Sequence, residues 1–204
     1  MRTKNLVKTT LKLASSVALA TCLMAAAVSS SHARDVNGVN MEESYVVDGQ
    51  NLILNGAGVH VINRVNIFAI GYYLPKQKTT QAELLASPGP IRLKLVMIKA
   101  VESELMSRRF LADMRTSTSK DERIQLLSQL MALGQGFATV GDWKVGDVMS
   151  IEWNKSKGTS FYSNGKHIGE PLKDDLTMQA IMRIWVGDNS ASPKLKRQLL
   201  GEKD

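Results

Sequence analysis

The chain has 204 residues and one cysteine, and its 26 Lys and Arg against 19 Asp and Glu give a formal net charge of +7 at pH 7. Four of the basic residues lie in the first 33 positions, so residues 34–204 hold 22 basic and 19 acidic groups, a net charge of +3. This balance gives little support for nucleic-acid binding through a basic patch. Because the cysteine is Cys22, residues 34–204 have neither disulfides nor thiol chemistry.

The N-terminal 33 residues have the composition of a secretory signal peptide. A basic start is followed by an apolar run, Leu13–Val28, and Ser31-His32-Ala33 offers a small-x-small cleavage site. We therefore predict cleavage after Ala33 and one exported domain over residues 34–204, for which a bacterial periplasm is the fitting compartment. Lipid anchoring at Cys22 is disfavoured, because threonine precedes this cysteine where a small residue is usual. No later apolar run approaches the roughly 20 residues of a membrane span, so no transmembrane segment is predicted.

The first elements of the domain are predicted to be strands. Residues 34–43 are polar and are expected to form a loose lead-in. Ser44–Val47 and Gln50–Leu54 flank Asp48-Gly49, which is typical of a type I′ turn in a β-hairpin. Gly56-Ala57-Gly58 then reads as a small-residue turn that leads into a long apolar stretch.

The stretch from Leu54 to Pro75 is too long for an ordinary strand, so it forms either one exceptional strand or two joined by a kink. His60, Arg64 and Asn66 have even spacing within it. In an unbroken strand they lie on the same face as Phe68. That face is either the floor of a cleft or a solvated surface.

Helical and β signals alternate in the middle of the chain. Thr80–Ala86 predicts a short helix ended by prolines, and Ile91–Ile98 a strand. From Val101 to about Arg115 the spacing is helical, with a face that we interpret mainly as core: Met106, Phe110 and Met114. Ser119–Glu122 has the capping-box pattern and opens a helix through Leu133, expected to end at Gly134 or Gly136.

The last third predicts a meander followed by two helices. The expected strands are Val148–Trp153, Thr159–Ser163 and Lys166–Ile168, the last two joined by an Asn-Gly turn. One helix starts at Asp174 or Asp175 and ends at Gly187, and a second covers Ser192–Leu200. Antiparallel hairpins with segregated helices indicate an α+β fold in which helices cover one face of a sheet.

Motifs for known chemistry are scarce. His60 and His167 are the only histidines after residue 33 and lack metal-ligand spacing, so no metal is expected. Nucleophile-elbow, phosphate-loop and dinucleotide patterns are absent from the sequence, so no cofactor is expected either. His167 is expected to be exposed beside a hairpin turn, which leaves His60 as the better candidate for a functional or a structural role.

Four segments together resemble the chalcone isomerase family: Gly56-Ala57-Gly58, Phe68–Pro75, Trp185-Val186-Gly187 and Ser192–Arg197. They are most similar to its bacterial, signal-bearing chalcone isomerase-like branch, in matching order from about residue 40 to 201. The resemblance implies an open-faced β-sandwich in which an antiparallel sheet and a helical layer enclose a cleft. Members of the family cyclise chalcones to flavanones, and others bind fatty acids.

The resemblance also implies where functional residues lie. The arginine of the isomerases falls on His60 and their strand threonine on Phe68, while their tyrosine, asparagine and a further polar residue fall on Leu105, Ala112 and Ile184. These replacements leave an apolar cleft with few donors for a developing enolate, and a neutral histidine carries less positive charge than arginine.

Fatty-acid-binding members hold the carboxylate with an arginine and a tyrosine at the mouth of an apolar pocket. In this sequence Arg64, Arg108 or Arg109 is a candidate for the cation, and Tyr72 or Tyr73 for the hydroxyl. The alternative is that these arginines are ordinary solvated charges.

Three hypotheses follow. The first is a non-catalytic binder of a small apolar or amphipathic ligand, and the second an isomerase that uses His60 as acid and base. The third, an envelope protein that acts only through its surface, predicts a cleft filled by its own side chains.

Overall fold

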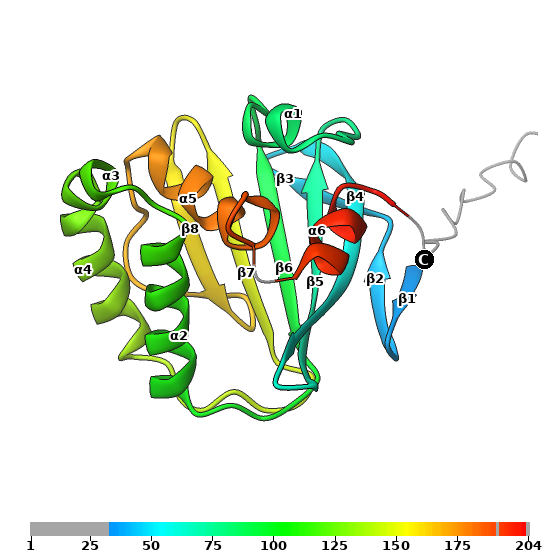
Figure 1. Cartoon of the computed structure of the whole chain (residues 1–204), viewed down its shortest axis with the longest axis horizontal. Helices are drawn as coiled ribbons and strands as arrows, with labels where there is room; N and C mark the ends of the chain where they lie inside the picture. The colour runs from blue at the N-terminus through cyan, green and yellow to red at the C-terminus, as the bar shows by residue number, and fades with distance from the viewer. Residues whose placement is uncertain (1–32, 191, 203–204) are drawn as a thin grey trace, which may run out of the picture. The chain divides into compact units, whose positions relative to one another are not determined.

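The computed structural model describes residues 33–190 and 192–202, so the predicted signal peptide up to His32, with Cys22, lies outside the described residues. The centre of the fold is an antiparallel sheet in the order β3-β4-β5-β6-β7-β8-β9 (Figure 1). Its strands are β3 Ser44–Val47, β4 Gln50–Ile62, β5 Val65–Leu74, β6 Ile91–Met97, β7 Val148–Asn154, β8 Gly158–Ser163 and β9 Lys166–His167. The strands predicted at Ser44–Val47, Ile91–Ile98, Val148–Trp153, Thr159–Ser163 and Lys166–Ile168 are thereby confirmed, with small shifts at their ends.

Residues 34–43 are not the expected loose lead-in. They form a hairpin of β1 Ala33–Val36 and β2 Val39–Glu42. Its turn is Asn37-Gly38, where both residues have positive φ angles of 56° and 80°, as a type I′ turn requires. Val36 and Met41 pack with Leu54 and Tyr73 on the face of the sheet opposite the main core.

The long stretch from Leu54 to Pro75 is neither one strand nor a kinked pair in line. The chain reverses at Asn63 and Arg64, whose φ angles are 49° and 65°, and β5 returns antiparallel to β4. Arg64 therefore lies in an exposed turn instead of on a strand face. His60 nevertheless lies beside Phe68, because the two residues are partners across the hairpin.

The Gly56-Ala57-Gly58 segment is not a turn but lies within β4, where it receives a helix. A Cβ atom at Gly56 would overlap the Gln198 carbonyl oxygen and lie 2.6 Å from that of Leu199. Both residues belong to the last helix, α6 Pro193–Leu199. The preceding residue, Asn55, forms a β-bulge and donates to the carbonyls of Lys78 and Leu199, at 2.9 and 2.8 Å. The small residues and the bulge thus fix α6 against the strand.

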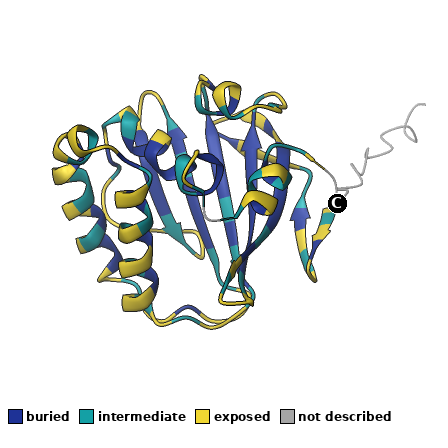
Figure 2. Cartoon of the chain, in the orientation of Figure 1, coloured by how far each residue is buried: buried dark blue, intermediate teal, exposed yellow. Residues whose placement is uncertain are grey.

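The helices cover one face of the sheet (Figure 1). Besides α6 they are α1 Gln81–Leu85, α2 Ser103–Thr116, α3 Lys120–Gln125, α4 Leu127–Phe137 and α5 Asp175–Val186. Figure 2 shows the buried residues concentrated on the strands and on the inner helix faces. The predicted apolar face of α2, with Met106 and Phe110, lies in this core together with Met178 and Trp185 of α5. None of the helices within the described residues has the length and apolar character to cross a membrane.

The helix predicted after Ser119 is two helices. Ser119 caps α3 in the expected capping box, but the helix breaks at Leu126, whose side chain is fully buried. The second helix, α4, passes through Gly134 and Gly136 and ends at Phe137. Gly136 is retained inside the helix because a Cβ there would lie 3.2 Å from Ile168 Cγ2.

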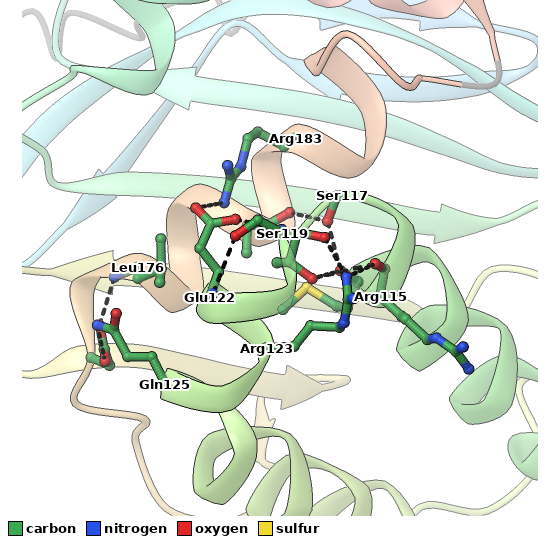
Figure 3. A network of polar contacts seen from close by, with 12 residues as sticks. Arg115, Ser117, Ser119, Glu122, Arg123, Gln125, Leu176 and Arg183 are labelled. Carbon is green, nitrogen blue, oxygen red and sulfur yellow. Dashed lines mark hydrogen bonds and ion pairs between the residues drawn. The ribbon is translucent and has the colours of Figure 1, made fainter.

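A polar network joins the corner between α2 and α3 to α5 (Figure 3). The carboxylate of Glu122 accepts from the Ser119 backbone and, at 2.9 Å, from the Arg183 guanidinium. The Ser117 hydroxyl donates to the Ala180 carbonyl at 2.8 Å. Burial alone raises the pKa of Glu122, but the bonds from Ser119 and Arg183 outweigh it and hold this pKa below its usual value. The network therefore fixes the end of α2 to the helical layer.

Candidate functional site

An open cavity of about 570 Å³ lies beside the turn between β4 and β5. Its wall is mainly apolar and comes from the sheet, from α2 and from the end of α5. The lining residues are His60, Ile62, Asn63, Val65, Ile67, Phe68, Leu95, Lys99, Ala100, Val101, Glu102, Leu105, Met106, Arg109, Phe110, Asp113, Met149 and Trp185. Such a cavity fits the size range of small-molecule pockets, roughly 300–1,000 Å³.

Three rings form one side of the cavity. The imidazole of His60 stacks on Phe68 with ring centroids 4.7 Å apart and an interplanar angle of 11°. Phe68 in turn meets Trp185 edge to face at 6.3 Å. A bulge at Ile67 turns that residue and Phe68 to the same cavity, because β5 has one more residue than β4 at this point.

His60 is buried, with 9% of its surface exposed. Its Nδ1 atom has no hydrogen-bond partner among the described residues. Burial lowers the pKa of the imidazole, while the nearby Asp113 carboxylate opposes this shift and the Arg109 guanidinium adds to it. His60 is therefore neutral at pH 7 and acts as a polar but uncharged part of an apolar wall.

The charged groups of the cavity lie at its rim. Lys99 lies two residues beyond the end of β6, and its amide and that of Ile98 both donate to the Ile67 carbonyl, at 3.1 and 2.9 Å. Across the rim, Arg109 on α2 forms an ion pair with Asp113 at 3.1 Å. No hydrogen bond or ion pair joins the Lys99 ammonium to another described residue, so this cation is available to a ligand.

Four of the sequence-predicted site residues meet at this cavity: His60, Phe68, Leu105 and Arg109. Five described residues from the same prediction are not part of its wall: Arg64, Tyr72, Arg108, Ala112 and Ile184.

The positions of these five residues explain their absence. Arg108 is exposed and pairs with Glu104 at 3.4 Å, and Ala112 lies on the exposed side of α2. The side chain of Tyr72 is fully buried under α5, where its hydroxyl donates to the Met182 carbonyl at 3.0 Å and burial raises its pKa. Ile184 packs half-buried against the core. Tyr73 points to the other face of the sheet.

Sequence reasoning missed several residues of the wall. The sequence predicts Met106 and Phe110 as core and gives Trp185 no site role, yet each is both a core residue and part of the cavity wall. Lys99 had a usable signal, because it is the first charged residue after the fully apolar end of β6. The rim charges Glu102 and Asp113 had none.

The arrangement is suited to holding an apolar chain with a charged end. The inner wall buries alkyl or aromatic groups, and the rim offers Lys99 and Arg109 to an anion. No group of three potential metal ligands gathers anywhere in the part of the chain that the structure describes.

Comparison with known proteins agrees with this geometry. The sequence profile of a family described as chalcone isomerase-like matches residues 33–201. A crystal structure of a fatty-acid binding protein from Arabidopsis thaliana (AtFAP1) superposes with a TM-score of 0.62. The two sequences are 13% identical, and the similarity covers 80% of this chain and 92% of the plant protein, so it shows a shared fold. No match was found among the curated proteins.

Proposed function

The chain belongs to the chalcone isomerase-like family, and from this premise we propose that it is a non-catalytic binding protein for a small apolar or fatty-acid-like ligand. The observation that carries the proposal is the open cavity of about 570 Å³, with an apolar wall and a cation at its rim. An open cavity also argues against a protein that acts only through its surface, since that hypothesis expected a filled cleft.

The chemistry of the cavity matches an acyl chain with a carboxylate. Each buried CH₂ group contributes about 0.8 kcal/mol of apolar transfer free energy, so an alkyl chain against Leu95, Met106, Phe110 and Met149 supplies most of the affinity. The carboxylate stays near water at the rim, where Lys99 binds it without displacing another described partner.

Support for binding over catalysis comes from the same residues. The sequence resemblance places His60, Phe68 and Leu105 where the isomerases carry an arginine, a threonine and a tyrosine, and all three line the cavity. A neutral imidazole and two apolar side chains provide little stabilisation for an enolate. The plant structure with the shared fold is that of a fatty-acid binding protein.

Titration with a fluorescent long-chain fatty acid tests this proposal. We expect saturable micromolar binding that Leu105→Asp weakens at least about tenfold, because the carboxylate places a charge at the cavity mouth. Leu127→Asp is the matched control, since Leu127 is 58% exposed on α4 while Leu105 is 51% exposed. Absence of saturable binding, or equal effects of both substitutions, would contradict the proposal.

We further propose that the protein works in the periplasm after removal of residues 1–33. The support is the basic start, the apolar run and the small-x-small site of the sequence. Cell fractionation followed by N-terminal sequencing tests this: the product is expected in the periplasmic fraction and to begin at Arg34. Full-length protein in the cytoplasm would overturn it.

A second candidate function is an isomerase that acts on a chalcone-like substrate. It is favoured by one observation, the His60 imidazole in the cavity wall, whose Nδ1 atom has no partner among the described residues. Burial lowers the pKa of this imidazole and keeps it in the neutral form that a general base requires. Loss of chalcone absorbance on incubation with the wild type, abolished in His60→Gln, would support this function, while turnover unchanged by the substitution would exclude the role of His60.

A further inference from the structure

A groove of about 640 Å³ lies apart from the cavity beside His60, and most of its lining residues are polar. One wall is the start of the hairpin β1–β2, the other is α6, and β4 lies between them. Its lining residues are Arg34, Asp35, Val36, Asn37, Ala57, Gly58, Val59, Val61, Asn66, Ser192, Lys194, Leu195, Gln198 and Glu202. Asn66, expected beside Phe68, therefore lies on the opposite face of the sheet.

The part of β4 in this groove has a free edge. The neighbouring strand β3 pairs only with Gln50–Ile53, and the last backbone bond on that side runs from the Leu54 amide to the Glu43 carbonyl, at 2.9 Å. From Gly56 to Ile62, β4 pairs with β5 alone among the described residues. The sheet is thus one strand wider at the start of β4, where β3 pairs with it, than at its end.

Strand geometry shows which backbone groups face this edge. In an L-peptide strand, the side of the sheet to which a side chain points fixes the direction of its N–H and C=O groups. Leu54 points to the face of β1–β2, and its amide points toward β3. Beyond the bulge at Asn55, the residues on that same face are Ala57, Val59 and Val61. Their amides and carbonyls therefore point to the free edge.

The residues of β4 that line the groove are these three and Gly58. The groove walls carry charges of both signs, Arg34 and Lys194 against Asp35 and Glu202, so they do not select a ligand of one charge. One end is closed by a hydrogen bond from Asn66 to Asn37, at 3.2 Å. What distinguishes this groove is a row of backbone donors and acceptors on its floor.

We propose that the groove binds an extended peptide segment of a partner protein, which adds to β4 as a strand in line with β3. The peptide is recognised through its main chain, because unpaired strand edges bind strands and the walls show no preference for charge. From Ala57 to Val61 the edge accommodates about five residues at roughly 3.3 Å each. The hairpin and α6 on either side admit a single strand and prevent a second sheet from stacking there.

Peptides selected from a random dodecapeptide phage library on the full mature chain test this site. The selected peptides, made synthetically, are expected to bind in competition with one another. Successive amides of a bound strand point to opposite edges, so only every second amide of the peptide faces β4. N-methylation of this set of residues is expected to weaken binding at least about tenfold, and N-methylation of the other set to leave it unchanged. Bound peptide is also expected to slow hydrogen exchange at the Val59 and Val61 amides.

Val59→Pro removes an outward amide without touching the pairing to β5, and is expected to abolish peptide binding while the circular dichroism spectrum is retained. Val46→Pro is the matched control. Alternation along β3 directs the Val46 amide away from β4, to the outer edge of the sheet, so peptide binding is expected to persist. Equal sensitivity to N-methylation of both sets, unchanged exchange at Val59 and Val61, or recovery of no binding peptide would each overturn the proposal. If Val59→Pro unfolds, the N-methylated peptides and the exchange data on the wild type decide.

Discussion

The His60 imidazole lies parallel to the Phe68 ring across the β4–β5 pair, at 4.7 Å between centroids. Together the two rings close one side of the cavity with a flat, uncharged surface. The wall is therefore built for contact with apolar groups.

The stability of the protein is expected to depend on pH through His60. Its pKa is held below that of an unfolded histidine, near 6.5, mainly by burial, with Asp113 opposing and Arg109 adding to the shift. The unfolded state thus binds the proton more tightly, so the contribution of His60 is full above about pH 6.5 and is lost as the pH falls through the folded pKa. In urea unfolding, the wild type should lose stability relative to His60→Leu between pH 8 and pH 5. Parallel curves for the two proteins would contradict this.

A methyl group at Gly56 is expected to destabilise the fold strongly. In Gly56→Ala the Cβ atom meets backbone carbonyls of α6, which cannot rotate away, and overpacking of this kind costs about 1–3 kcal/mol. Gly134→Ala is the control. Gly134 lies in the interior of α4, where an added Cβ would come no closer than 3.8 Å to Leu111 Cδ1, and the alanine is expected to gain about 0.5–1 kcal/mol of helix propensity. Chemical denaturation should therefore show shifts of opposite sign.

Asn55 is expected to be more important for stability than its size suggests. It bonds the Lys78 and Leu199 carbonyls, and its Oδ1 accepts from the Lys78 amide at 2.6 Å. Asn55→Ala leaves these groups without partners, at about 1–3 kcal/mol for each one that stays buried. Asn51→Ala, at an exposed position of the same strand, should change the free energy of unfolding little. Equal midpoints for both variants would refute the role of Asn55.

Removing the Ser119 cap should weaken the link between α3 and α5. The Ser119 hydroxyl accepts from the Glu122 amide at 3.2 Å, and the same glutamate holds Arg183. Ser119→Ala is expected to cost about 1 kcal/mol in thermal unfolding. Ser128→Ala, an exposed serine of α4, serves as comparison and should have no such cost.

Lys99 is expected to select carboxylates over neutral head groups. Lys99→Glu should weaken the binding of a long-chain fatty acid at least about tenfold, because a charge-assisted hydrogen bond worth about 1.5–3 kcal/mol is lost. The alcohol of the same chain length should bind wild type and variant equally. Lys76→Glu, exposed beyond the end of β5, is the control. A similar loss for acid and alcohol would show that Lys99 does not contact the head group.

Much of the fold was predictable because its signals are local. Asp48-Gly49 and Asn164-Gly165 turns, the Ser119 box and the Asp174 cap all form as their sequences predict. The reversal at Asn63-Arg64 was missed because an arginine occupies a positive-φ position that glycine usually marks. The break at Leu126 depends on burial of one side chain, which no local pattern reports.

The site was predictable only in part because a strand face is longer than the cavity on it. Phe68 and Tyr72 point to the same face of β5, yet α5 covers Tyr72 while the cavity opens at Phe68. Alternation along a strand gives the face, and only the packing of distant helices decides which part of it stays open. On α2 the separation is a matter of helical periodicity: adjacent residues lie about 100° apart, so Arg109 lines the cavity while Arg108 faces solvent.

The Ile67 carbonyl, which accepts from the amides of both Ile98 and Lys99, holds the strand side of the cavity mouth through main-chain bonds. The helix side is held in a comparable way. Val101 exchanges two main-chain bonds of 2.9 Å with Trp143, and Ser103 bonds the Asp142 side chain at 3.0 Å and the Val140 carbonyl at 2.7 Å. The mouth is therefore framed on both sides by hydrogen bonds that do not involve the apolar side chains of the wall.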